Sequence, residues 1–158
     1  MGLVLCRVDD RLVHGQVVIG WGRPLAVKFI VLVDDGVRAS SWEQDLYRMA
    51  APEGVDVIFA RTDEALGALP DWAADPRPGI LLTGDLATMA ALHGAAPLIV
   101  HRINLGGIHH RPDRHERLRY LYLSAEEESL LAAMRATGAD ITAQDLPTTP
   151  PVGVEALG

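Results

Sequence analysis

Several residue types are scarce in this chain of 158 residues. Cys6 is the only cysteine, so an intrachain disulfide is excluded. All but one of the 14 basic residues are arginine, Lys28 being the exception, and aromatic residues make up only 5%. The rest of the composition, 49% hydrophobic and 22% charged, is that of an ordinary globular protein. The length suits one domain with a sizeable core, and we expect residues 1–158 to form it.

Long apolar runs and an excess of basic charge are also missing. No run of apolar residues approaches the roughly 20 needed to cross a bilayer, and the N-terminus has no signal-peptide pattern. The net charge of -7 is opposite in sign to the basic surface that nucleic-acid binding requires. We therefore expect a cytoplasmic, soluble protein that does not bind nucleic acid.

Short β-rich apolar segments alternate with helical patterns along the whole chain. The expected strands cover residues 3–8, 29–33, 55–60, 80–83, 98–103, 120–123 and 140–143. The expected helices cover residues 16–21, 42–51, 62–69, 86–93 and 125–137. This alternation predicts an α/β fold: a single-domain, open, mostly parallel β-sheet with helices on both faces.

Residues between these elements indicate where helices start and stop and where loops lie. Ser124 and Thr62, each followed by acids, are typical helix starts, and Gly138 is a typical helix stop. Pro70 and residues 75–79 indicate a surface loop. The proline-containing tail, residues 147–158, is expected to be extended or loosely packed.

Ligands of open α/β sheets bind beyond the carboxyl ends of the strands. That rule selects four loops here, at residues 9–15, 34–36, 84–85 and 104–110. We expect any functional site to be built from them.

The first of these loops has the highest concentration of charged and titratable side chains. It contains Arg7, Asp9, Asp10, Arg11 and His14, and it leads through Gly15 into the helix expected from Gln16. Backbone N–H groups at a helix start bind anions, a glycine lets the backbone approach closely, and arginines match phosphate oxygens.

His14 is suited to accept a phosphoryl group. A histidine with an ordinary pKa of about 6.5 is mostly neutral at pH 7 and has a nitrogen lone pair available. Asp9, Asp10 or a backbone carbonyl can hold the other ring nitrogen, and the sequence does not choose among them. A structural histidine held by an aspartate beside ion-paired arginines would have the same composition, so composition alone does not decide the function.

Residues 7–18, Arg-Val-Asp-Asp-Arg-Leu-Val-His-Gly-Gln-Val-Val, resemble the signature of the enzyme IIB subunits of the mannose/fructose/sorbose phosphotransferase family. The resemblance continues in Val33-Asp34-Asp35, in Met49-Ala50-Ala51-Pro52 with Gly54-Val55, in Ile103-Asn104-Leu105-Gly106-Gly107-Ile108-His109, in Tyr122-Leu123 and in residues 144–151. It thus covers nearly the whole chain.

The resemblance implies a phosphoryl carrier in a sugar phosphotransferase system. A phosphorylated IIA protein would charge His14, and the group would pass to a sugar brought in by the membrane subunits IIC and IID. The family pattern places the acceptor at His14 and matches Arg7 and Arg11 to arginines of the same motif, and we expect Asp10 to be catalytic together with them. The other expected site residues are Asp9, Gly15, Gln16, Asp34, Asp35, Asn104, Gly107 and His109. It also implies no cofactor, peripheral association with the membrane transporter and a possible homodimer.

The sequence is compatible with other functions. A regulatory module that keeps the fold and senses the phosphorylation of its partners is the main alternative. The spacing of His101, His109, His110 and His115 fits no usual zinc pattern, so we expect no metal. Cys6 lies inside a strand, unlike the cysteine of other IIB types. The basic segment 111–119 is expected to border the active loop and attract an acidic face of IIA.

Overall fold

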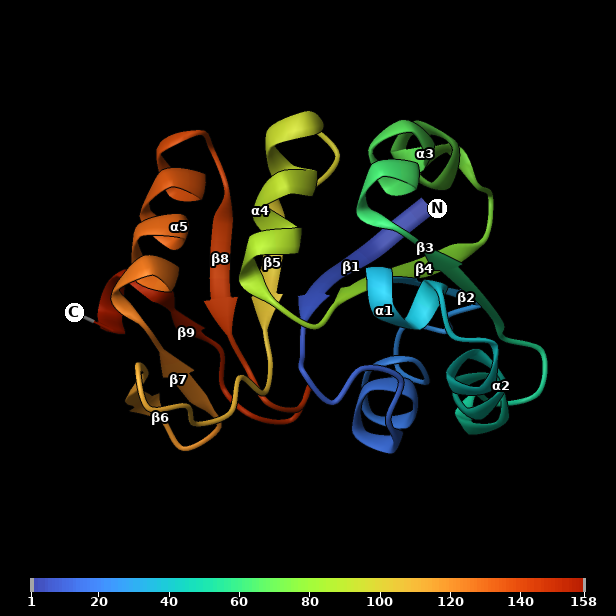
Figure 1. The fold of residues 1–158 in the computed structure, drawn as a ribbon, viewed down its shortest axis with the longest axis horizontal. Helices are drawn as coiled ribbons and strands as arrows, with labels where there is room; N and C mark the ends of the chain where they lie inside the picture. The colour runs from blue at the N-terminus through green and yellow to red at the C-terminus, as the bar shows by residue number, and fades with distance from the viewer. Residues whose placement is uncertain (1, 158) are drawn as a thin grey trace.

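Figure 1 shows the computed structural model, which describes residues 2–157 and, for residues 16–18, the backbone only. The first half contains β1 (Gly2–Val8), the π-helical turn η1 (Gln16–Trp21), β2 (Phe29–Val33), α1 (Asp35–Arg38), α2 (Ser41–Ala50), β3 (Asp56–Ala60) and α3 (Thr62–Ala74). The second half contains β4 (Pro78–Thr83), α4 (Leu86–Ala95), β5 (Arg102–Leu105), β6 (His115–Leu118), β7 (Leu121–Leu123), α5 (Ala125–Ala136), β8 (Asp140–Ala143), β9 (Val152–Gly153) and the 3-10 turn η2 (Val154–Leu157).

The main sheet is 7-stranded, in the order β3-β2-β4-β1-β5-β8-β9. Every neighbouring pair is parallel except β8 with the short edge strand β9. β6 and β7 form a separate antiparallel ribbon. The predicted fold class, an open and mostly parallel sheet, is confirmed.

Strand residues alternate between two apolar cores, because successive side chains of a strand point to opposite faces. In β2, Phe29 and Val31 join the core under α3, α4 and α5, whereas Ile30 and Leu32 join the core under η1 and α2. Figure 1 shows these two groups of helices on opposite sides of the sheet. The apolar runs are nearly continuous because both faces of the central strands are buried.

Local signals explain where the helices begin. Asp34 and Asp85 accept hydrogen bonds from backbone N–H groups in the first turns of α1 and α4. Ser124 and Glu127 form a reciprocal capping box at the start of α5, as expected from the sequence. Gly138 ends the same helix with a φ of 98°, a conformation that favours glycine.

Two sequence expectations about the fold are wrong, and a third holds only in part. Pro70 lies inside α3 rather than in a loop, on an exposed side of the helix where water can bind the carbonyl left unpaired. Residues 98–100 form a turn before β5, with Leu98 91% exposed. The tail is less loose than expected, since β9 pairs with β8 and Val154 is buried.

The structure also shows elements that the sequence reading left out, namely α1, β6, β9 and η2. All are short, with four residues or fewer, so their periodicity is too weak to recognise. Among the described residues, no helix combines the length and apolar character needed to cross a membrane.

Candidate functional site

Arg7 is the buried centre of the candidate site. It lies in β1, its side chain is 0% exposed, and it shares its register with Asn104 in β5. Nη1 donates to Asn104 Oδ1 and to the Gln144 carbonyl, the latter at 2.8 Å. Asn104 in turn approaches Thr142 on β8, so a polar row crosses three parallel strands. Burial lowers the pKa of Arg7, and the charge of Asp9 partly offsets this effect.

Asp9 joins Arg7 to the loop that follows β1. Its carboxylate, also 0% exposed, accepts from Arg7 Nη2 at 3.1 Å. It accepts from the Arg11 guanidinium at Nε (2.9 Å) and Nη2 (2.8 Å) and from the Arg11 backbone N–H at 3.1 Å. Burial alone would raise the pKa of Asp9, but the hydrogen bond from Arg11 and the charges of both arginines hold it below its usual value. The carboxylate therefore stays ionised and orients both guanidinium groups.

The segment after β8 closes this arrangement from the other side. The Asp145 carbonyl accepts from Arg7 Nη2 at 2.9 Å and from the Trp21 indole at 3.2 Å. The Asp145 carboxylate lies 3.1 Å from Arg11 Nη2. The Arg7 guanidinium also stacks over the Trp21 ring, with Cζ 4.8 Å from the centroid.

Two glycines let the loop after β5 pass close to these charges. A Cβ on Gly106 would collide with the Arg7 guanidinium and the Asp9 carboxylate. A Cβ on Gly107 would lie 3.3 Å from both Arg11 Nε and Asp9 Oδ1. The Gly107 carbonyl accepts from the Asp10 backbone N–H at 2.8 Å. Because this loop and the loop after β1 follow neighbouring strands, they lie against each other.

Asp10 makes the second connection between these loops. Its Oδ2 accepts from the His109 backbone N–H at 2.8 Å, and its Oδ1 lies 2.5 Å from His109 Nδ1. Since an ionised carboxylate can only accept, Nδ1 carries the proton and the imidazole is fixed in orientation. Arg114 Nη1 donates to the His109 carbonyl at 2.8 Å and so supports the same loop.

His14 occupies the exposed end of the first loop. Leu12 turns the chain with a φ of 60°, Val13 is buried, and His14 and Gly15 follow, both exposed, before η1 begins. A π-helical turn, like any helix, has backbone N–H groups at its start that are not used within the helix. The arrangement places an exposed imidazole at the start of η1, in the same loop as the partly exposed Arg11, which suits transient binding of a phosphoryl group.

The family described as "PTS system sorbose subfamily IIB component" matches residues 3–157. The chain belongs to this family. It is a phosphoryl-carrier component of a sugar phosphotransferase system, as the resemblance of the sequence predicted.

Relatives of this IIB component are similar to it in sequence over nearly the full length of both chains. It is 27% identical over 151 residues to the N-acetylgalactosamine-specific phosphotransferase enzyme IIB component 2 of Escherichia coli (strain K12), covering 95% of this chain and 94% of the relative. It is 25% identical to the sorbose-specific EIIB component of Klebsiella pneumoniae, covering 98% and 93%. The crystal structure of manxB from Thermoanaerobacter tengcongensis has a TM-score of 0.86 and is 27% identical, covering 98% and 93%.

The structure brings most of the expected site residues of the IIB component together and places two elsewhere. Asp34 caps α1 and lies near Gly84, where a Cβ would be 3.8 Å from Asp34 Oδ2. Asp35 instead accepts from the backbone N–H of Thr62 at 2.8 Å, so it anchors the start of α3. The side chain of Gln16 lies outside the described residues.

Several residues of the cluster were not predicted. They are Trp21, Gly106, Gln144 and Asp145. Gln144 and Asp145 act largely through backbone carbonyls, which have no residue-specific sequence signal. Their presence in the family-like segment 144–151 was the only hint.

The remaining histidines have separate surroundings. His110 packs edge-on against Tyr122, with ring centroids 5.7 Å apart, and His115 begins the β6–β7 ribbon. Among the described residues, no group of histidine, cysteine or acidic side chains is arranged to hold a metal ion.

The basic segment 111–119 is largely occupied by internal ion pairs. Arg114 makes two bonds to Glu127, at 2.7 and 2.8 Å, and Arg117 pairs with Glu128. Arg111 and Arg119 remain on the exposed surface. The arginines of this segment that remain for docking a partner are thus reduced to these two.

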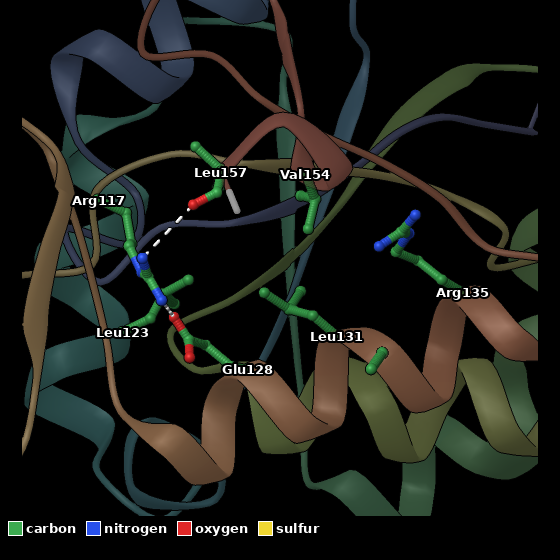
Figure 2. A pocket seen from close by; sticks show the side chains of 8 residues that line it. Arg117, Leu123, Glu128, Leu131, Arg135, Val154 and Leu157 are labelled. Carbon is green, nitrogen blue, oxygen red and sulfur yellow. Dashed lines mark hydrogen bonds and ion pairs between the residues drawn. The ribbon is translucent and has the colours of Figure 1, made fainter.

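A small cavity lies in a different part of the molecule. Figure 2 shows it between α5, the β6–β7 ribbon and η2, walled by the Arg117–Glu128 pair. Its volume of about 160 Å³ is below the ~300–1,000 Å³ of typical small-molecule sites. None of its lining residues belongs to the cluster around Arg7, so it is not part of the candidate site.

Proposed function

We propose that this IIB component accepts a phosphoryl group on His14 and passes it to a sugar. The observation that carries the proposal is the exposure of His14 at the carboxyl edge of the sheet, three residues after Arg11. In the first transfer the P–N bond to the donor histidine breaks as a P–N bond to His14 forms, and the proton that His14 gives up is balanced by the one that the released donor imidazole takes. In the second transfer the P–N bond to His14 breaks as a P–O bond to a sugar hydroxyl forms, and the hydroxyl proton balances the one that the His14 imidazole regains, so no oxidant or cofactor is needed.

Arg11 is the arginine that can meet the phosphoryl group. It is partly exposed, and Asp9 and Asp145 hold its guanidinium in place. Its hydrogen bond to Asp9 raises its pKa further above the ordinary value, so the charge is permanent. A fixed planar cation suits the charge that spreads over the equatorial oxygens during transfer.

Arg7 has a positioning role in this proposal, not a contact with phosphate. Its guanidinium is buried and already donates to Asn104, Asp9 and the carbonyls of the segment after β8. It sets the geometry of Asp9, which in turn orients Arg11. Asp10 has a similar role toward His109 at the rim. A Cβ on Gly15 would meet nothing within 4 Å, whereas Gly107 lets its loop lie close to Arg11 and Asp9.

The system-level roles follow from the family. IIB components work with IIA proteins and with membrane subunits. We infer that phosphorylated IIA is the donor and that IIC and IID present the sugar, with the IIB component peripherally associated with the membrane transporter. We also propose that residues 1–158 act as one IIB domain; a homodimer is compatible with this arrangement.

Phosphorylation with labelled phosphate tests the proposal. Incubation with the upstream carriers should add one acid-labile phosphoryl group, and His14→Ala should abolish the labelling. The exposed loop position predicts a change in the free energy of unfolding below about 0.5 kcal/mol for this variant. Labelling that survives in His14→Ala, or that appears on Cys6, would reject His14 as the acceptor. A wild-type protein that never accepts phosphate would favour the regulatory alternative.

A further inference from the structure

Two carboxylates share the guanidinium of Arg11. Its Nε and Nη2 donate to Asp9 at 2.9 and 2.8 Å, and Nη2 also donates to Asp145 Oδ1 at 3.1 Å. Nη2 has two N–H groups, so it can serve each carboxylate with one of them. Together with Arg7, the cluster contains two arginines and two aspartates, whose formal charges cancel. A phosphoryl group that approaches Arg11 therefore meets no net positive charge while both carboxylates stay in place.

The two carboxylates differ in how firmly they are held. The Asp9 side chain is 0% exposed and is bonded to Arg7 as well as to Arg11, so it cannot leave. The Asp145 side chain is 31% exposed, and among the described residues Arg11 is the one hydrogen-bond partner of its carboxylate. Water can hydrate this carboxylate when the contact breaks, and a partly solvated ion pair costs little to separate.

The main chain at Asp145 is fixed independently of the carboxylate. Its carbonyl accepts from Arg7 Nη2 at 2.9 Å and from the Trp21 indole at 3.2 Å. The preceding carbonyl, of Gln144, accepts from Arg7 Nη1 at 2.8 Å. Rotation of the Asp145 side chain alone is therefore enough to move its carboxylate away from Arg11, and the segment after β8 does not have to shift.

We propose that Asp145 is the exchangeable counter-ion of Arg11, which holds the guanidinium between transfers and competes with the phosphoryl group for it. The inference rests on the proposed function, in which Arg11 meets the phosphoryl group carried by His14. In the exchange the contact between Nη2 and Asp145 Oδ1 breaks as a contact between Nη2 and a phosphoryl oxygen forms. Asp9 keeps the guanidinium oriented throughout. Carboxylate and phosphoryl oxygens make the same kind of charge-assisted hydrogen bond, so one can replace the other.

This competition prevents Arg11 from trapping the phosphate. One additional hydrogen bond from a charged group to the stored phosphohistidine would favour the phosphorylated form by roughly tenfold or more. When Arg11 must first release Asp145, the lost contact offsets the new one, so the phosphorylated and free forms of His14 gain similar stabilisation from Arg11. The guanidinium can still act on the transition state, in which charge spreads over the equatorial oxygens.

The test is the phosphoryl-exchange equilibrium with a purified IIA protein of this family, measured as the distribution of labelled phosphate between the two proteins. Asp145→Asn removes the competing charge at nearly constant side-chain volume and should shift the equilibrium toward phosphorylated His14 by about tenfold. Asp145→Ala should shift it at least as far. Asp140→Asn is the matched control, because it removes an exposed charge from β8, the strand that leads to Asp145. It should leave the equilibrium within about twofold of the wild-type value.

A double variant decides whether Asp145 acts through Arg11. In an Arg11→Ala background, Asp145→Asn should leave the equilibrium nearly unchanged, because no guanidinium is released. A full shift in that background would overturn the inference, since Asp145 would then only repel the phosphate. A wild-type equilibrium in both Asp145 variants, or a shift toward phosphorylated IIA, would also overturn it, and His14 would remain the acceptor in each case. If the wild-type protein accepted no phosphate from IIA, the proposed function would fail, and this inference with it.

Discussion

Both carboxylate oxygens of Asp10 face His109, one on the backbone N–H at 2.8 Å and one on Nδ1 at 2.5 Å. The pair joins the loop after β1 to the loop after β5 at the rim of the proposed phosphoryl site. Because the pair is partly solvated, it contributes little to the stability of the fold, and its main effect is to fix the geometry of the two loops.

Asp10→Asn should slow phosphorylation of His14 while the protein stays folded. An amide can accept through only one atom, so one of the two contacts with His109 is lost and the loops separate more easily. We expect a stability loss of about 1 kcal/mol or less. Labelling rates and thermal melts measure the two effects. His110→Ala is the control, because its ring packs on Tyr122 instead; an equal rate loss there would remove the special role of the Asp10–His109 pair.

Asp9→Asn should destabilise the fold by about 3–5 kcal/mol at pH 7, since it leaves buried Arg7 without its counter-charge. The folded pKa of Asp9 lies below its ordinary value of 3.8. The ionised carboxylate therefore stabilises the wild type fully above about pH 4, and this contribution is lost as pH falls through the folded pKa. Urea unfolding at several pH values should show a weaker acid dependence in Asp9→Asn.

The exposed carboxylate Asp63 provides the comparison for this experiment. Its pKa is also lowered, by the Arg61 hydrogen bond, but both groups are open to solvent. Asp63→Asn should leave the unfolding free energy nearly unchanged. Equal behaviour of the two variants would mean that burial of the Asp9 pair contributes nothing.

Gly106→Ala should destabilise the protein by about 1–3 kcal/mol, because the new methyl group overlaps the Arg7 and Asp9 side chains. Gly94→Ala, in α4, meets nothing within 4 Å and should be neutral or stabilising. Denaturant midpoints compare the two. A neutral Gly106→Ala would show that the cluster can shift without cost.

Arg11→Ala should slow both phosphorylation by IIA and discharge to sugar, with little change in their equilibrium. A carrier must release its phosphate, so only contacts that strengthen in the transition state accelerate both directions. Arg11→Lys should recover part of the rate, because a point charge does not match two oxygens at fixed geometry. Forward and reverse rates with purified IIA provide the measurement. A shifted equilibrium with one direction still fast would make Arg11 a ground-state clamp, and Arg111→Ala controls for lost surface charge.

The sequence predicted the central strands well and the cluster only in part. Buried strands such as Phe29–Val33 can be recognised in the sequence because their β-branched and apolar residues are uninterrupted. The composition of the loop after β1 identified it as a site, but it did not show that the two aspartates of the loop have different roles. Asp9 turns inward and Asp10 outward, and that difference depends on where β1 ends and which strands flank it. The contact between Asp10 and His109 also needed the knowledge that β5 adjoins β1.

Cys6 has a practical consequence for studying this carrier. Its thiol is buried in β1, and burial raises its pKa to about 12, so almost no thiolate is available at neutral pH. Thiol-reactive probes should therefore not react with Cys6 in the folded native protein. A cysteine introduced on the surface, as in Met49→Cys or Leu98→Cys, can be labelled selectively without first replacing Cys6. A fluorophore attached at one of these positions would report directly whether a partner approaches the surface around it.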